Sequence, residues 1–198
     1  MPAPSSSIGR RFTDVCWSAV CSLNGLRECK LGRDVEVRDA RGRGRGVFAL
    51  RDIPANALVC RYDADLRSSG DQEQAARAGL TTGDYAMALG SDWVLDAESE
   101  GSSNYARYVN HSLRRCNLRA GLMNMPSWVC WLPNVPTTPC ALYFETMRPI
   151  AAGEELCIDY GSEYWDKTTA LGYRLHDQLP VLSPLWRLHP RRLMIDYW

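Results

Sequence analysis

The sequence lacks several features that would set it apart from ordinary globular proteins. Its 198 residues hold no apolar run near the roughly 18 that a membrane-spanning helix needs, and no internal repeat or heptad pattern. Residues Met1–Gly9 are rich in Pro and Ser and hold no apolar stretch, so we expect a flexible arm and no secretory signal. With 45% hydrophobic and 23% charged residues, we expect an intracellular protein with one folded core.

Metal-binding signals are also scarce. The chain has eight cysteines and three histidines, but no two cysteines have the C-x-x-C spacing usual in zinc modules. The cysteines are scattered through apolar or strand-like segments. We therefore expect free, mostly buried thiols in a reducing compartment and no structural metal.

Charge is balanced overall but uneven along the chain. The formal net charge is zero, with only Lys30 and Lys167 as lysines among 23 basic residues. Residues 1–61 carry 11 basic and 6 acidic groups, whereas residues 62–104 carry 2 and 9. The acidic block suits a basic peptide, and the arginine-rich start suits an acidic partner such as nucleic acid, although solvated surface explains either block as well.

Short apolar runs separated by turn residues predict a mainly β fold of small antiparallel sheets with few short helices. The Tyr85–Leu89 and Trp93–Leu95 runs flank Gly90–Asp92, which predicts a hairpin. The other expected strands are Val35–Val37, Val47–Leu50, Ala57–Tyr62, Ser127–Leu132 and Ala141–Met147. We expect helices over Asp71–Leu80 and Ser102–Val109, the second capped by Ser102 or Ser103.

The Arg-Gly repeat Arg41–Gly46 admits three interpretations. A dinucleotide fingerprint needs a helix after the glycines, but residues 47–50 continue as a strand, so this interpretation fails. An Arg/Gly nucleic-acid segment is usually longer and disordered. The third interpretation is a turn between strands, where glycines without Cβ atoms let the backbone approach a ligand.

Two further segments carry polar side chains suited to chemistry. Asn110-His111-Ser112 has the residue types of a hydrolase, but the Gly-x-Ser-x-Gly elbow and an acid that orients the imidazole are missing. Asp159-Tyr160-Gly161 follows a turn and a strand, which holds a phenol beside a glycine. By itself such a tyrosine packs in a core more often than it reacts.

Taken in order, these segments resemble the SET-domain family of protein lysine methyltransferases. The resemblance covers about residues 35–165 and is specific as an ordered set, although each piece alone is weak. It implies a SET fold of small antiparallel sheets with a knot-like crossing of the Asn110 segment with the Tyr160 segment. Residues 161–165 resemble the ending of compact viral and histone-directed members. The matching segments are Gly44–Ala49 with Ile53-Pro54, Tyr85, Val94–Ala97, Asn104–Ser112, Cys116-Asn117, Ile150–Leu156 and Asp159–Gly161.

The resemblance implies that S-adenosylmethionine is the cofactor. The glycines of the turn would let the backbone approach its methionine part, Asn110 would hydrogen-bond it, and His111 would border its adenine. An aromatic residue often packs against that adenine, and Trp165 stands at its position. The implied cofactor-binding residues are Gly44, Arg45, Gly46, Val47, Asn110, His111 and Trp165.

The resemblance also assigns catalytic roles. Tyr160 would be the catalytic phenol, which orients the lysine nitrogen and the transferring methyl, and Tyr85 would line the lysine channel. Ile158 stands where many members have Phe or Tyr and where the number of methyl groups is set. An aliphatic residue cannot hydrogen-bond a water there, which favours more than one methyl per lysine.

Three departures from the family pattern bear on the expected organisation. One extra residue lies between Ser112 and Asn117, and Asp65 replaces the commoner, longer Glu. No cysteine follows Cys157, so the zinc-binding segment that closes the channel in many members is missing. We therefore expect an N-terminal lead-in over residues 1–34, a SET domain over 35–165 and a segment over 166–198 that closes the site.

We conclude from the sequence that the function is methyl transfer to a lysine, with a histone tail as the expected substrate and the nucleus as the expected compartment. A lysine methyltransferase for non-histone proteins is an alternative, because the same motifs allow it. A catalytically silent SET module that binds a tail or nucleic acid is the other alternative. The altered strand around Asp65 favours silence, whereas intact Asn110 and Tyr160 oppose it.

Overall fold

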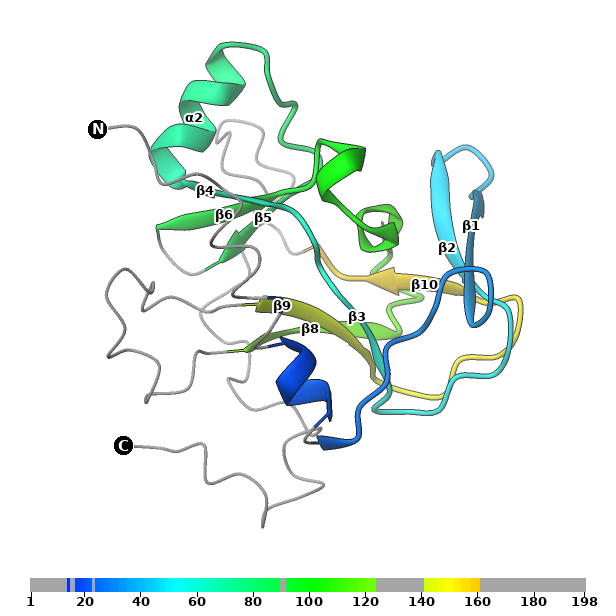
Figure 1. Cartoon of the computed structure of the whole chain (residues 1–198). Helices are drawn as coiled ribbons and strands as arrows, with labels where there is room; N and C mark the ends of the chain where they lie inside the picture. The colour runs from blue at the N-terminus through cyan, green and yellow to red at the C-terminus, as the bar shows by residue number, and fades with distance from the viewer. Residues whose placement is uncertain (1–13, 15–16, 23, 90–91, 124–140, 161–198) are drawn as a thin grey trace.

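Three small sheets form the framework of the protein. The computed structural model describes residues 14, 17–22, 24–89, 92–123 and 141–160. Figure 1 shows the β1–β2 hairpin at one end of the molecule, α2 with strands β4, β5 and β6 at the other end, and β10 between them. This arrangement confirms the expected mainly β fold with few helices.

The first sheet brings distant parts of the chain together in the order β1-β2-β10-β7. Strands β1 (Val35–Asp39) and β2 (Arg45–Ala49) form an antiparallel hairpin, and β10 (Glu155–Ile158) pairs antiparallel with β2. Strand β7 (Asn110–His111) pairs with β10 in parallel, which differs from the expectation of antiparallel sheets alone. Parallel neighbours require a long connection, here residues 112–154.

The other two sheets are antiparallel. The first has the order β3-β9-β8 and the second the order β4-β6-β5. Helix α2 packs on the second of them and begins after Ser68, whose hydroxyl accepts a hydrogen bond from the Asp71 main-chain nitrogen. The elements are β3 (Leu58–Arg61), β4 (Asp65–Ser68), α2 (Ser69–Arg77), β5 (Ala86–Leu89), β6 (Trp93–Asp96), β8 (Leu118–Met123) and β9 (Ala141–Thr146).

The expected strands within the described residues and the first helix are confirmed, with bounds shifted by one to three residues. Of the expected helix over Ser102–Val109, residues Tyr105–Tyr108 form a short 3₁₀ helix, η2. The expected serine cap is wrong, because Asn104 caps η2 by accepting from the Ala106 nitrogen. A second 3₁₀ helix, η1 (Glu100–Ser102), precedes it. Strands β4, β7 and β8 were not anticipated, and the expected strand at Ser127–Leu132 lies outside the described residues.

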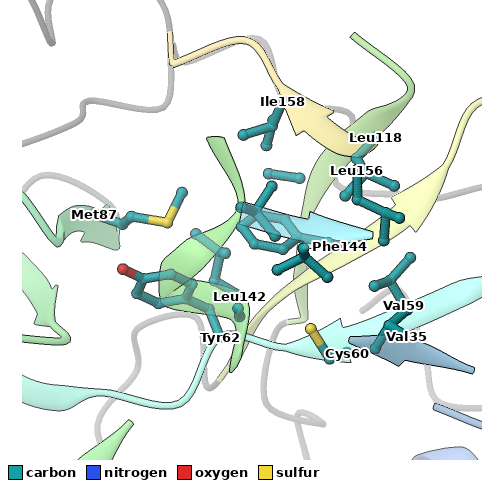
Figure 2. Close-up of a cluster of buried hydrophobic side chains, with 14 of the residues drawn as sticks. Val35, Val59, Cys60, Tyr62, Met87, Leu118, Leu142, Phe144, Leu156 and Ile158 are labelled. Atoms are coloured by element: carbon teal, nitrogen blue, oxygen red, sulfur yellow. The ribbon is translucent and has the colours of Figure 1, made fainter. Parts of the chain in front are cut away.

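The larger of two apolar clusters among the described residues lies where the sheets meet. It is built from side chains of β1, β2, β3, β8, β9 and β10, with Phe144 almost fully buried near its middle (Figure 2). The Tyr62 ring packs edge-on against Phe144 with ring centroids 5.8 Å apart. This core fixes β10, and the segment that follows β10 carries Tyr160.

No helix within the described residues is long and apolar enough to cross a membrane. The five described cysteines are free: Cys60 and Cys157 are buried, and Cys21, Cys29 and Cys116 are partly buried.

Candidate functional site

The two polar segments identified in the sequence lie side by side. Strand β7 runs parallel to β10, with Cys157 opposite Asn110 and Ile158 opposite His111. Beyond the strands, the Ser112 nitrogen donates to the Ile158 carbonyl at 3.1 Å. The Tyr160 nitrogen donates to His111 Nδ1 at 3.0 Å. The expected crossing of the Asn110 and Tyr160 segments is therefore present.

The His111 ring is oriented by this contact. Because Nδ1 accepts a hydrogen bond from the main chain, the ring proton of the neutral imidazole belongs on Nε2. The Asp159 carboxylate lies 3.7 Å from the same Nδ1 and forms an ion pair only if the ring is protonated. The His111 and Tyr160 ring centroids are 5.4 Å apart.

Asn117 holds the chain that follows Ser112 against β10. It is fully buried, its Oδ1 accepts from the Cys157 nitrogen at 2.9 Å, and its Nδ2 donates to the Glu155 carbonyl at 2.8 Å. Such buried side-chain bonds replace ladder bonds that neighbouring strands would otherwise supply. Asn117 was quoted as part of the resemblance but was assigned no site role.

Asn110 lies against the glycine turn. Its Nδ2 donates to the Arg45 carbonyl at 3.1 Å and to Glu155 Oε1 at 3.0 Å. A Cβ added at Gly46 would lie 2.9 Å from each of these side-chain atoms, Asn110 Nδ2 and Glu155 Oε1, closer than real contacts allow. Position 46 therefore needs a glycine because neighbouring side chains leave no space for a Cβ atom, whereas position 44 needs one because its φ is +72°.

Two arginines converge on Glu155. Arg43 hydrogen-bonds the carboxylate, and Arg115 Nη1 lies 3.4 Å from the same Oε2. The Glu155 side chain is only 5% exposed, and its hydrogen bond raises the pKa of Arg43. Together with Asn110, these groups make a polar cluster beside the glycine turn that could bind a group carrying both a carboxylate and an ammonium.

A second feature is a pocket between β3, β5, η2 and the end of β10. Tyr160 lies in it, and its hydroxyl donates to the Val109 carbonyl at 2.6 Å. The Tyr62 hydroxyl donates to the Tyr85 carbonyl at 2.8 Å, and burial raises the pKa of Tyr62. The lining residues are Tyr62, Asp84, Tyr85, Ala86, Met87, Ala106, Arg107, Val109, Phe144 and Tyr160.

Arg107 contributes a buried cation to the pocket wall. Its guanidinium carbon lies 4.1 Å from the centroid of the Tyr85 ring and 5.3 Å from that of Tyr108. Glu100 Oε1 lies 4.0 Å from Arg107 Nη1 and also accepts from Arg45 at 2.6 Å. Arg107 was not among the site residues expected from the sequence.

The structure groups the sequence-predicted residues into two neighbouring sets. Gly44, Arg45, Gly46, Asn110 and His111 surround the turn and the crossing, and Tyr85 and Tyr160 share the pocket.

The remaining predicted residues lie elsewhere. Val47 and Ile158 are buried in the apolar core, and neither belongs to the described lining of the pocket. Trp165 lies outside the described residues.

Sequence reasoning missed Tyr62, Arg107 and Glu155 as members of these two sets. A signal existed for Tyr62, because many family members have Tyr-x-Gly-Glu where this chain has residues 62–65, and Tyr62 keeps the tyrosine of that pattern. Arg107 and Glu155 stand inside matched motifs. Their positions in the site depend on packing that no motif shows.

Nucleophilic cysteine and metal chemistry find little support at the crossing. Burial raises the pKa of the Cys157 thiol to about 11, so it stays protonated near neutral pH. Among the described residues, no three His, Cys, Asp or Glu side chains are grouped closely enough to hold a metal ion.

Residues 44–161 match the SET domain model, which covers the turn, the crossing and the pocket. The chain belongs to the SET-domain family. The match ends inside the expected 35–165 domain, and the outer boundaries stay a prediction.

Several curated histone-lysine methyltransferases are similar to the chain. Su(var)3-9 of Drosophila melanogaster is 31% identical over 139 residues, which are 65% of this chain and 20% of that protein. Human EHMT1 is 31% identical over 147 residues, 72% of this chain and 10% of that protein. The N-lysine methyltransferase KMT5A-A of Xenopus laevis is 32% identical over 126 residues, 61% of this chain and 34% of that protein. The matches therefore span between a tenth and about a third of these relatives.

Proposed function

We propose that the chain transfers a methyl group from S-adenosylmethionine to a lysine ε-amine of a histone tail, and that it acts at chromatin in the nucleus. The observation that carries the proposal is the pocket that Tyr85 and Tyr160 share directly beside the Asn110–His111 crossing. The names of the similar proteins, which are histone-lysine and N-lysine methyltransferases, support the same reaction.

The residues at the turn fit the cofactor. Both hydrogens of the Asn110 amide are used by the Arg45 carbonyl and Glu155. Oδ1 is then left to accept from the cofactor's ammonium. Arg43 and Arg115 carry the charge that its carboxylate needs. When bound, S-adenosylmethionine supplies an electrophilic methyl group on a sulfonium.

The chemistry left to the protein is to dehydrate and orient the amine. The Tyr160 hydroxyl donates its proton to the Val109 carbonyl, so an amine that approaches the phenol meets its oxygen as a hydrogen-bond acceptor. A phenol fixed in this way acts as a preorganised dipole and needs no rearrangement during the reaction. The apolar lining from Met87, Ala106 and Phe144 favours the uncharged amine.

The acidic block supports a basic substrate. Asp84 is exposed and belongs to the pocket lining. It is part of the acidic block of residues 62–104, which also contains Asp63, Asp65 and Glu98. A tail rich in Lys and Arg gains favourable long-range attraction to such a surface. Equal activity on neutral peptides would count against the histone substrate.

The test is incubation of the chain with deuterated-methyl S-adenosylmethionine and mixed core histones, with mass spectrometry of the peptides. We expect heavy methyl groups on a histone lysine, and loss of at least 100-fold in rate in Tyr160→Phe because the orienting oxygen is gone. Tyr105→Phe is the matched control. Its hydroxyl bonds the Cys29 and Val59 carbonyls away from the pocket, so the variant should lose stability but keep transfer.

Other outcomes separate the alternatives. Transfer only to non-histone proteins of a cell extract would favour the non-histone enzyme. Cofactor binding by calorimetry with no transfer to any protein would favour the silent module. Equal rates in the wild type and Tyr160→Phe would remove Tyr160 from the reaction.

A further inference from the structure

We propose that Arg107 is a positioning residue that keeps the pocket electropositive, so that the target lysine is bound as its neutral, nucleophilic amine. The inference rests on the proposed function and concerns how the same pocket selects the reactive protonation state. It is carried by the burial of Arg107, by its contacts with the pocket wall and by the charges around it.

The first observation is that the guanidinium is buried with unused donors. Arg107 is 9% exposed, and no described residue accepts a hydrogen bond from its Nε or Nη1. Burial of a cation without full hydrogen bonding lowers the stability of the fold, so its presence calls for a functional explanation. Here the faces of Tyr85 and Tyr108 stabilise it in part.

The second observation is that the acids near Arg107 already have arginine partners. Glu100 is 63% exposed and accepts from Arg45, so it is shared between two guanidiniums. Asp96, on β6, is fully buried and lies 3.4 Å from Arg67 Nη1. Glu100, which is exposed and shared with Arg45, therefore neutralises Arg107 only in part, and Asp96 is paired with Arg67.

No other charge on the pocket wall offsets it. The remaining titratable groups of the described lining are three phenols, Tyr62, Tyr85 and Tyr160, and the exposed Asp84. Burial raises the pKa of Tyr62, and solvent screens the exposed carboxylate of Asp84. Within the described lining of the pocket, the guanidinium of Arg107 is the buried charge.

This charge acts on the amine before transfer. A lysine ammonium that enters the pocket is repelled by Arg107, so it releases its proton to solvent. The neutral amine then uses its lone pair to form the N–C bond, while the C–S bond breaks and its electron pair stays on sulfur. A like charge within about 4–6 Å lowers an amine pKa by 1–3 units. We expect about one unit here because Glu100 compensates in part.

The test measures kcat against pH at saturating histone peptide and cofactor for Arg107→Gln, Arg107→Lys and Glu100→Gln. The peptide is the one that the wild-type chain methylates in the histone mixture. Because kcat reports groups in the bound complex, its acidic limb reports the bound lysine. We expect Arg107→Gln to move that limb up by about one pH unit, with a tenfold loss at pH 7 that is recovered in alkaline buffer. Arg107→Lys should keep the wild-type profile, and Glu100→Gln should move it to lower pH.

A second readout needs no turnover. Calorimetry of peptide binding in two buffers of different ionisation enthalpy gives the protons released, with S-adenosylhomocysteine present to fill the cofactor site without a sulfonium charge. At the pH of the wild-type acidic limb, wild type and Arg107→Lys should release clearly more protons per peptide than Arg107→Gln. Should Arg107→Gln fail to fold, Glu100→Gln, altered at an exposed position, decides by the direction of its shift.

A uniform loss of kcat at every pH in Arg107→Gln, with unchanged proton release, would make Arg107 merely structural and overturn the inference. A shift of the Glu100→Gln profile to higher pH would overturn it as well. These results differ from failure of the proposed function, in which the wild-type chain transfers no methyl group to any protein and the inference falls with it.

Discussion

Replacement of Gly46 by alanine tests how the glycine turn and the crossing fit together. The new Cβ would lie 2.9 Å from Asn110 Nδ2, 2.9 Å from Glu155 Oε1 and 3.0 Å from the Ala40 Cβ. Gly46 has no positive φ, so the effect is steric and carries no backbone strain. Overpacking of a tight site costs about 1–3 kcal/mol, and we expect the free energy of unfolding to fall by about 2 kcal/mol.

The same clash predicts a loss of cofactor affinity. The Asn110 amide and the Glu155 carboxylate must both move to admit the methyl group, which disrupts the two bonds by which Nδ2 fixes the orientation of the amide. One misplaced hydrogen bond to a charged group corresponds to about 1.5 kcal/mol, or roughly tenfold in Kd. Urea denaturation measures the first effect, and titration calorimetry with S-adenosylhomocysteine measures the second.

Gly79→Ala is the matched control. Gly79 lies after α2 at a φ of +69°, and nothing lies within 4 Å of an added Cβ. Left-handed strain alone costs an alanine about 1 kcal/mol, without any effect at a distant site. The reasoning is refuted if Gly46→Ala binds the cofactor like the wild type while losing stability, or if the two variants cannot be told apart.

Two further predictions concern stability. Gly121→Ala should lower the free energy of unfolding by about 2–3 kcal/mol, because its Cβ would lie 2.4 Å from Cζ of the buried Tyr143 ring on β9; unchanged urea denaturation would show that the ring moves freely. Asp34→Asn should cost about 2 kcal/mol, because the buried carboxylate accepts from Arg33 and the Lys30 nitrogen, which hold its pKa well below the usual range. Since the folded carboxyl binds its proton less tightly than the unfolded one, this stability is present above about pH 4 and is lost as the pH falls further. The free energies of unfolding of the wild type and Asp34→Asn should therefore converge in acid. A difference that stays constant with pH would contradict the assignment.

The sequence was sufficient for the elements whose pattern is local. The β5–β6 hairpin and strands β2, β3 and β9 are short, largely apolar runs bounded by turn residues, and helix α2 follows the cap residue Ser68. Strand β8 was missed because its run Leu118–Met123 includes Gly121, which is unfavourable in strands unless a neighbour needs the space. That need becomes visible only when Tyr143 of β9 is placed opposite it.

The site shows the same division. The glycine turn, Asn110 and Tyr160 could be named from motifs because their residue types are restricted by chemistry. Arg107 and Glu155 could not be assigned from motifs, because their roles depend on ion pairs with residues from distant segments of the chain. A helix around Arg107 was predicted, but its short 3₁₀ form and its cap were not, since Asn104 caps it in a segment whose serines are equally good cap residues.

Strand β10 connects the two halves of the site through its alternation. Leu156 and Ile158 point into the apolar core, whereas Glu155 interacts with Arg43 on the polar side. A register slip of one residue would turn Glu155 towards the core and Leu156 towards the arginines, which the hydrophobic cost forbids. The register that the core enforces therefore also sets Glu155 beside Asn110 and, through the two residues that follow the strand, brings Tyr160 to the pocket. Cofactor turn and tyrosine pocket cannot shift independently, so a substitution that loosens the packing of β10 should impair both together.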